Sequence, residues 1–167
     1  GLESLYFIPD AMSKASAAFK KVRAGTALDQ QELLHLKCAV LTEVCKQYHA
    51  KGWVQQFHLG ALRGNNSRML RELGPDTGFD SIGDYPQALS MSRFFNQLDD
   101  TDQLTKTIIY NINPNDNDVF ATMLGNFSFG VPGKMQWGSG WWFMDQKDGM
   151  ERQMNTLSNM GLLSRFV

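Results

Sequence analysis

Apolar residues recur at spacings of three and four along the first fifty residues, which is the period of an amphipathic helix. Residues 2–24 form the first such run, and Gly25 ends it. Asp29 begins the second run, and Glu32 three residues later completes a capping box. Residues 1–50 are therefore predicted to be two helices. The apolar stripe predicted for the second helix comprises Leu33, Leu36, Val40, Val44 and Tyr48.

From residue 51 onward, short β-branched or aromatic runs alternate with helical patterns. This alternation predicts parallel strands joined by crossover helices, that is, βα units over residues 51–167. It does not separate an open doubly wound sheet from a segment of a barrel. The predicted strands are 53–59, 107–112 and 134–137, the predicted helices are 86–99, 116–127 and a last helix from 148, and 162–167 is strand-like.

Residues 61–84 are rich in Gly, Asn, Asp and Pro, and they are predicted to form a long loop with at most one helical turn. A loop of this length inside a compact domain is usually functional.

The composition is that of a globular protein, with 43% hydrophobic and 20% charged residues in a chain of 167. A net charge of -1 provides no basic field for a phosphate backbone, which argues against nucleic acid as the main partner. No apolar run reaches the roughly 18 residues that span a bilayer. Two cysteines do not make a disulfide scaffold and suit a reducing cytoplasm. Both ends of the chain look cut rather than finished.

The second predicted helix carries His35, Cys38, Cys45 and His49, which share one side of the helix. They cannot share one zinc ion, because the two histidines lie about 21 Å apart along the axis at about 1.5 Å per residue. The predicted apolar stripe points the other way, so both histidines are expected on the solvent face and both cysteines at its boundary.

His58 ends the first predicted strand, directly before the polar loop that contains Arg63, Asn65 and Asn66. The carboxyl ends of parallel strands are where α/β proteins bind ligands. A histidine at such a place can exchange protons near neutral pH. From the pattern alone, a hydrogen-bonded core histidine is about as good an interpretation as a site histidine.

Two other segments could carry chemistry. Asp76 and Asp80 are paired acids in the Gly-rich loop 74–80, although aspartates in such loops more often cap turns. Gly138 to Trp142 follows the third predicted strand, where glycines allow a ligand to approach closely and the tryptophan faces suit the C–H face of a sugar ring. A tryptophan pair is still more often part of a core or an interface.

Long motifs of the chain resemble the uronate isomerase (glucuronate isomerase) family, over essentially its whole length. The motifs are GWVQQFHLGALR at 52–63, LGPDTGFDSI at 73–82, TIIYNINP at 107–114, KMQWGSGWWFMDQKDGMERQ at 134–153 and LLSRFV at 162–167. The resemblance implies an α/β fold, a partial (β/α)8 TIM barrel of the amidohydrolase-like type with about three βα units preceded by two helices. It also implies that the chain is an internal or C-terminal-side fragment.

The family interconverts aldose and ketose uronates, D-glucuronate with D-fructuronate and D-galacturonate with D-tagaturonate, through a cis-enediol. Such chemistry needs a base, a group that polarises the carbonyl oxygen and a clamp for the sugar carboxylate. The resemblance implies a cytoplasmic enzyme of carbohydrate metabolism with a small uronate substrate, and the complete enzyme is expected to form a homo-oligomer. His58 is the expected catalytic residue, and the expected substrate-binding residues are Arg63, Asn65, Trp137, Ser139, Trp141 and Trp142.

The chain departs from the family pattern in several motifs. It contains neither the family's His-x-His nor its Thr-Asp-Ser-Arg, which supply metal ligands and an acid. Gly64 and Met144 stand where the family commonly has asparagine. A divalent metal, most plausibly zinc, is therefore expected in the complete family enzyme and none in this fragment. We expect the chain alone to be inactive and marginally stable; the alternative is a non-catalytic sugar-acid-binding fragment, or a subunit completed by another chain.

Overall fold

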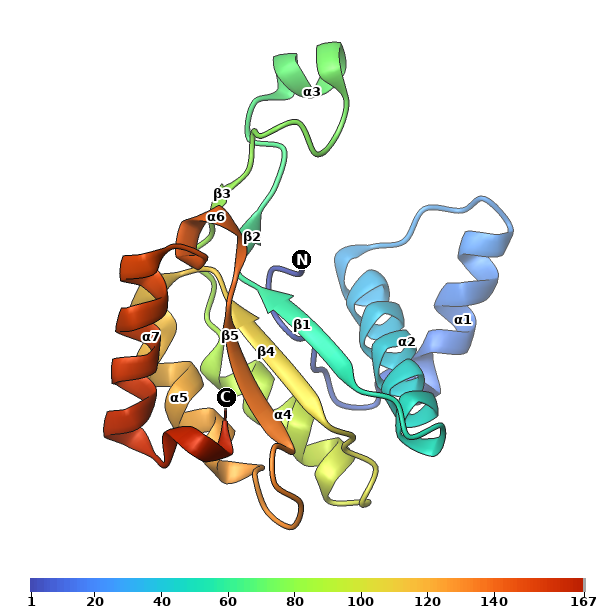
Figure 1. The fold of residues 1–167 in the computed structure, drawn as a ribbon. Coiled ribbons are helices and arrows are strands. Elements are labelled where there is room, and N and C mark those ends of the chain that lie inside the picture. The colour runs from blue at the N-terminus through green and yellow to red at the C-terminus, as the bar shows by residue number, and fades with distance from the viewer. Residues whose placement is uncertain (167) are drawn as a thin grey trace. The chain divides into compact units, whose positions relative to one another are not determined.

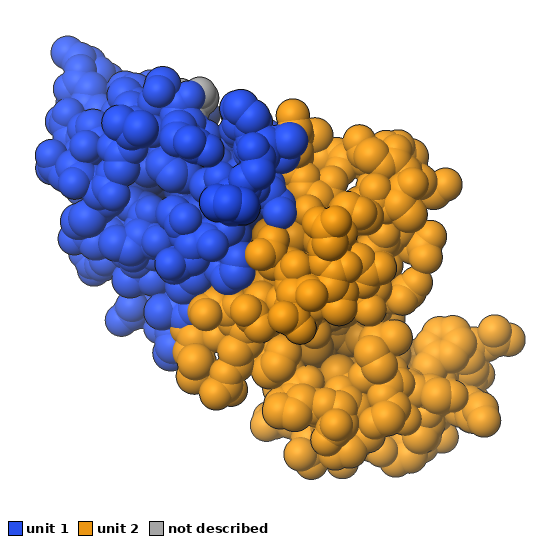
Figure 2. Space-filling view, turned by 90° about the horizontal axis from the view of Figure 1, so that it is seen from below, with its two compact units in different colours: residues 1–4, 56–88, 107–167 blue, residues 5–55, 89–106 orange. Residues whose placement is uncertain are grey.

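The computed structural model describes residues 1–166, and the chain divides into two compact units. The sheet unit contains residues 1–4, 56–88 and 107 onward, and the helical unit contains residues 5–55 and 89–106 (Figure 2). In chain order the elements are α1 (Ala11–Arg23), α2 (Gln30–Ala50), β1 (Gln55–Leu59), β2 (Ala61–Leu62), α3 (Ser67–Leu73), β3 (Ser81–Ile82), α4 (Ala88–Asp99), β4 (Thr107–Asn111), α5 (Asn117–Asn126), β5 (Met135–Ser139), α6 (Trp141–Met144) and α7 (Lys147–Met160).

The three predicted strands form one sheet in the order β1-β4-β5 (Figure 1). β4 and β5 are parallel, with Asn111 beside Ser139. The Ile112 amide donates to the Leu59 carbonyl at 3.1 Å, which sets His58 beside Tyr110 in a parallel ladder. The prediction of parallel strands is therefore confirmed, and all three carboxyl ends lie at one edge of the sheet.

Beyond each outer strand of this sheet, a single residue from elsewhere in the chain forms a further hydrogen bond to it. Leu2 forms a parallel bridge with Leu59, in which the Leu2 amide donates to the His58 carbonyl at 2.7 Å. On the far side, the Trp137 amide donates to the Phe166 carbonyl at 3.0 Å. Hydrogen bonding thus extends beyond β1 and β5 in both directions, as it does in a section of a barrel wall.

Side chains alternate strictly between the two faces of the sheet. One face is buried, and helices α5 and α7 contact it through β5. The other face is half-buried or exposed, and in a closed barrel it would point inward. The buried face carries Phe57, Leu59, Ile109, Asn111, Met135 and Trp137, and the other face carries Gln56, His58, Ile108, Tyr110, Gln136 and Gly138.

The first helix is shorter than predicted. The pattern predicted a helix over 2–24, but α1 begins at Ala11. Pro9 disfavours helical geometry at Ile8, and Asp10 has a left-handed φ of 60°. The predicted capping box of α2 is confirmed, because the Glu32 amide donates to Asp29 and the Asp29 amide donates back to Glu32.

The predicted orientation of α2 is wrong. His35, Cys38 and Cys45 are buried, with 4%, 2% and 1% of their surfaces exposed, whereas Leu33 and Val40 are exposed. The reason is the size of the residues at the contact between α1 and α2. Cys38 and Ala39 cluster with Ala11, and small side chains let two helices approach closely.

The short elements β2, β3 and α6 were not predicted, and α3 is longer than the single helical turn predicted in the loop 61–84. The loop 61–84 leaves the sheet as the antiparallel pair β2–β3 and carries the seven-residue helix α3 at its tip (Figure 1). Helix α6 follows β5 directly. The predicted strand-like run at 162–167 is instead a 3₁₀ turn at Leu163–Arg165, and its last residue, Val167, lies outside the described residues.

Candidate active site

His58 lies near the carboxyl end of β1, on the inward face of the sheet. Its ring packs against Tyr110 with a centroid separation of 4.5 Å, and the Tyr110 hydroxyl donates to Gln56 at 3.0 Å. Burial lowers the pKa of His58 below its ordinary value of 6.5. The imidazole is therefore neutral at neutral pH and can accept a proton.

His58 opens onto a cleft of about 610 Å³ at the carboxyl edge of the sheet. Pockets that bind small molecules usually have volumes of roughly 300–1,000 Å³, so a sugar acid can be accommodated. The structure thus brings together four of the seven predicted site residues. The cleft is lined by His58, Arg63, Trp141 and Trp142, together with Gly1, Asp76, Gly78 and Asp80.

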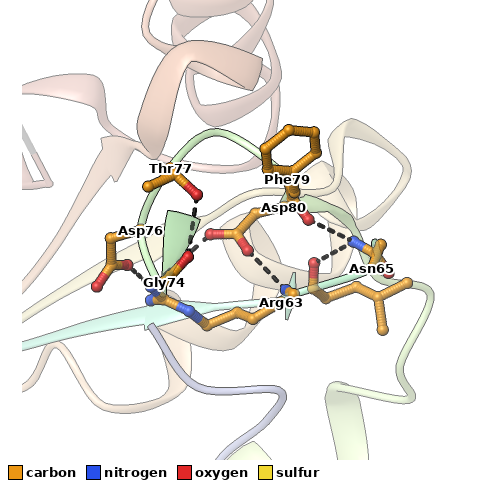
Figure 3. A network of polar contacts seen from close by, with 9 residues as sticks. Arg63, Asn65, Gly74, Asp76, Thr77, Phe79 and Asp80 are labelled. Atoms are coloured by element: carbon orange, nitrogen blue, oxygen red, sulfur yellow. Dashed lines mark hydrogen bonds and ion pairs between the residues drawn. The ribbon is translucent and has the colours of Figure 1, made fainter. Parts of the chain in front are cut away.

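Arg63 contacts two carboxylates, which Figure 3 shows, and also the ring of Trp141. It pairs with Asp76, and its Nη2 lies 3.7 Å from an Asp80 oxygen. The guanidinium carbon lies 5.4 Å from the Trp141 ring centroid, within the range of a cation–π contact. Asp76 is 71% exposed and Asp80 only 10%, so the Asp76 pair is the one that solvent weakens.

Asn65 and Asp80 fasten the loop that presents Arg63. The Gly64 amide donates to Asp80 at 2.8 Å. The Asn65 side-chain amide donates to the carbonyls of Leu62 at 2.8 Å and Phe79 at 3.3 Å (Figure 3). Asn65 was expected to bind substrate, but its amide hydrogens are directed to the loop backbone and it does not line the cleft.

Trp141 and Trp142 form the aromatic side of the cleft. Their rings are stacked, with centroids 5.4 Å apart and planes 3° from parallel. Trp141 has a φ of 52°, a costly conformation for a bulky residue that is often found at functional sites. Trp142 is 57% exposed and presents an apolar surface to the open cleft.

Trp137 and Ser139 were also expected in the wall, but neither lines the cleft. Trp137 is 5% exposed, because strand alternation turns it to the face opposite Gly138. Its indole nitrogen donates to Asn111 at 2.9 Å. The Ser139 hydroxyl donates to Asp145 at 3.3 Å.

Sequence reasoning missed Asp76 and Asp80 as site residues, although their signal was present. Two acids in one Gly-rich loop were interpreted mainly as turn caps. The backbone role is real for Asp80, which accepts from Gly64. The same carboxylate also faces Arg63. The two residues meet because β2 and β3 pair and bring the two ends of the loop together.

The resemblance implies a divalent metal, but the residues present do not fit one. Among residues 1–166, no three His, Cys, Asp or Glu side chains gather closely enough to hold a metal ion.

Within the described residues, no helix has both the length and the apolar character needed to cross a membrane.

A parallel sheet section backed by helices, with a histidine and an aromatic cleft at its carboxyl edge, is the arrangement of a segment of a (β/α)8 barrel enzyme. The chain belongs to the glucuronate isomerase family, whose model matches residues 1–167. It is 61% identical to a uronate isomerase of Flavobacterium johnsoniae and 55% identical to one of Opitutus terrae, over its whole length in both cases.

A solved structure agrees with this assignment. The uronate isomerase of Thermotoga maritima matches 97% of the chain with a TM-score of 0.82 and 28% sequence identity. The chain spans 34% of that protein and 36% of the length of the two curated relatives.

Proposed function

We propose that this chain forms one wall of the active site of a uronate isomerase, which interconverts an aldose uronate and its ketose isomer. The candidate substrates are D-glucuronate and D-galacturonate, with D-fructuronate and D-tagaturonate as products. The observation that carries the proposal is the placement of neutral His58 in the same cleft as Arg63 and the stacked tryptophans. Sequence identity of 54–61% to several uronate isomerases supports it.

Four residues of the cleft have roles that suit this reaction. His58 accepts or donates the proton that moves between C2 and C1, or it polarises the carbonyl oxygen. Arg63 binds the substrate carboxylate through its planar fork of donors. Trp141 and Trp142 pack against the sugar carbons and exclude water. No step is assigned to a metal ion, because the described residues provide no site for one.

The test is His58→Ala in the complete protein that carries this segment. Removal of a positioned proton-transfer group typically lowers kcat by about 10²–10⁴. We expect a loss of this size with an unchanged urea midpoint. A normal kcat with a lowered midpoint would instead make His58 a structural residue of the strand.

The competing proposal is a non-catalytic wall that only binds the sugar acid. In that case His58→Ala would weaken uronate binding, and no variant of the cleft would lower kcat at saturating substrate. Homo-oligomer formation and a cytoplasmic location also remain predictions, and size-exclusion chromatography of the complete protein tests the first of them.

A further inference from the structure

His58, Tyr110 and Gly138 form one row across three neighbouring strands. The register of β4 and β5 sets Tyr110 beside Gly138, and the β1–β4 ladder sets His58 on its other side. All three residues lie on the inward face of the sheet. The tyrosine ring is therefore the direct neighbour of the candidate catalytic imidazole within the wall.

Gly138 provides the space that the Tyr110 ring occupies. A Cβ atom built on Gly138 would lie 2.4 Å from Cε1 and 2.7 Å from Cδ1 of Tyr110, closer than real contacts allow. Any other residue at 138 would therefore push the ring out of its place. On the opposite side, the ring lies against His58 with an interplanar angle of 40°.

The Tyr110 ring is also fixed at its far end, because its hydroxyl donates to Gln56 at 3.0 Å. Gln56 lies on the same strand as His58, two residues earlier and on the same face. Three features thus hold the Tyr110 ring in one orientation. They are its contact with the His58 ring, the hydrogen bond to Gln56 and the space left by Gly138. A fixed ring at 4.5 Å restricts the tilt of the imidazole plane.

We propose that Tyr110 is a positioning residue for His58 in the isomerase site, with Gly138 as the residue that makes room for it. The inference rests on the proposed function of the cleft. Tyr110 does not line the cleft, so it acts through His58 rather than on the substrate. Small misplacements of a catalytic group can lower the rate by about a hundredfold.

The first experiment compares Tyr110→Ala with Tyr110→Phe in the complete protein. We expect Tyr110→Ala to lower kcat by between about tenfold and a hundredfold with little change in KM. Tyr110→Phe keeps the ring and should retain nearly normal kcat. Ile108→Ala, on the same strand and face two residues earlier, is the matched control and should leave kcat unchanged.

The dependence of kcat on pH distinguishes the two roles of Tyr110. A purely structural role would not change the pH at which kcat falls on the acid side of the profile, its acid limb. Loss of the ring exposes the imidazole to water, so the limb should shift upward toward the ordinary histidine value. The charged side chains that share the cleft with His58 are Arg63, Asp76 and Asp80, and none of them is altered in these variants. An unshifted limb in Tyr110→Ala would overturn the proposal.

The second experiment is a double-mutant cycle with Gly138→Ala. Alone, this variant should lower kcat because its methyl group displaces the ring. In the Tyr110→Ala background the ring atoms nearest to this methyl group are gone, so Gly138→Ala should cause little further loss. Losses that multiply would contradict the proposal. A normal kcat in His58→Ala would instead contradict the proposed function, so the two failures are distinguishable.

Discussion

The indole nitrogen of Trp137 donates a hydrogen bond to Asn111 Oδ1 at 2.9 Å, in a place that water does not reach. The same Asn111 oxygen accepts from Gln153 at 3.0 Å, and the Asn111 amide donates to Asn117 at 2.7 Å and to the Asn113 carbonyl at 2.9 Å. One side chain at the end of β4 therefore joins β5, α5 and α7 below the rim that carries the candidate active site.

Asn111→Ala should destabilise the complete protein strongly. Asn111 is fully buried, so the change leaves the donors of Trp137 and Gln153 without this acceptor. Each buried polar group that loses its partner costs roughly 1–3 kcal/mol. The loss is measured as a lowered midpoint of urea unfolding. Asn115→Ala is the control, since Asn115 is exposed in the 3₁₀ turn Pro114–Asp116 that follows β4 and should change the midpoint little.

In the proposed site, the exposed carboxylate of Asp76 would compete with the substrate carboxylate for Arg63. We expect Asp76→Asn in the complete protein to lower KM for uronates, because it frees the guanidinium without changing the shape of the loop. Asp80→Asn is the matched comparison. It should raise KM, since Asp80 also holds the Gly64 amide and thereby the loop that presents Arg63. An unchanged KM in both variants would place the substrate carboxylate elsewhere.

Trp142→Ala should weaken substrate binding without changing stability. Trp142 is 57% exposed and lines the cleft, so its removal takes an apolar surface from the site and little from the core. KM is expected to rise while the urea midpoint stays constant. Trp53 is equally exposed at 56% but belongs to the helical unit, so Trp53→Ala should leave KM unchanged.

The strands and the edge at which they end could be predicted from the sequence because both follow from local pattern. Thr107–Asn111 alternates between buried and half-buried positions. Strands joined by crossover helices run parallel, so their carboxyl ends lie at the same edge of the sheet. His58 could be singled out for the same reason, since it ends a strand before a polar loop. The match to long family motifs then separated a barrel segment from an open sheet.

The parts that could not be predicted depend on contacts between distant residues. Trp137 was assigned to the wall by its motif, but strand alternation turns it into the core, where its indole nitrogen donates to Oδ1 of Asn111. The face of α2 was misjudged because large apolar residues were weighted above Cys38 and Ala39, whose small size governs the approach of α1. Nothing local in the sequence indicates that Asp80 meets Arg63.

The lowered pKa of His58 predicts the direction of two pH dependences. Burial disfavours the imidazolium form, so the folded chain gives up this proton at a lower pH than the unfolded chain, whose histidine titrates at 6.5. Between the lowered value and 6.5 the unfolded state binds more protons, so stability is complete above 6.5 and falls as the pH drops through this window. His58→Gln should remove this part of the pH dependence from the urea midpoints. Because the neutral imidazole is the active form in the proposed reaction, the acid limb of the kcat/KM profile of the complete protein should have its midpoint below pH 6.5. A midpoint above pH 6.5 would show that another group controls the acid limb.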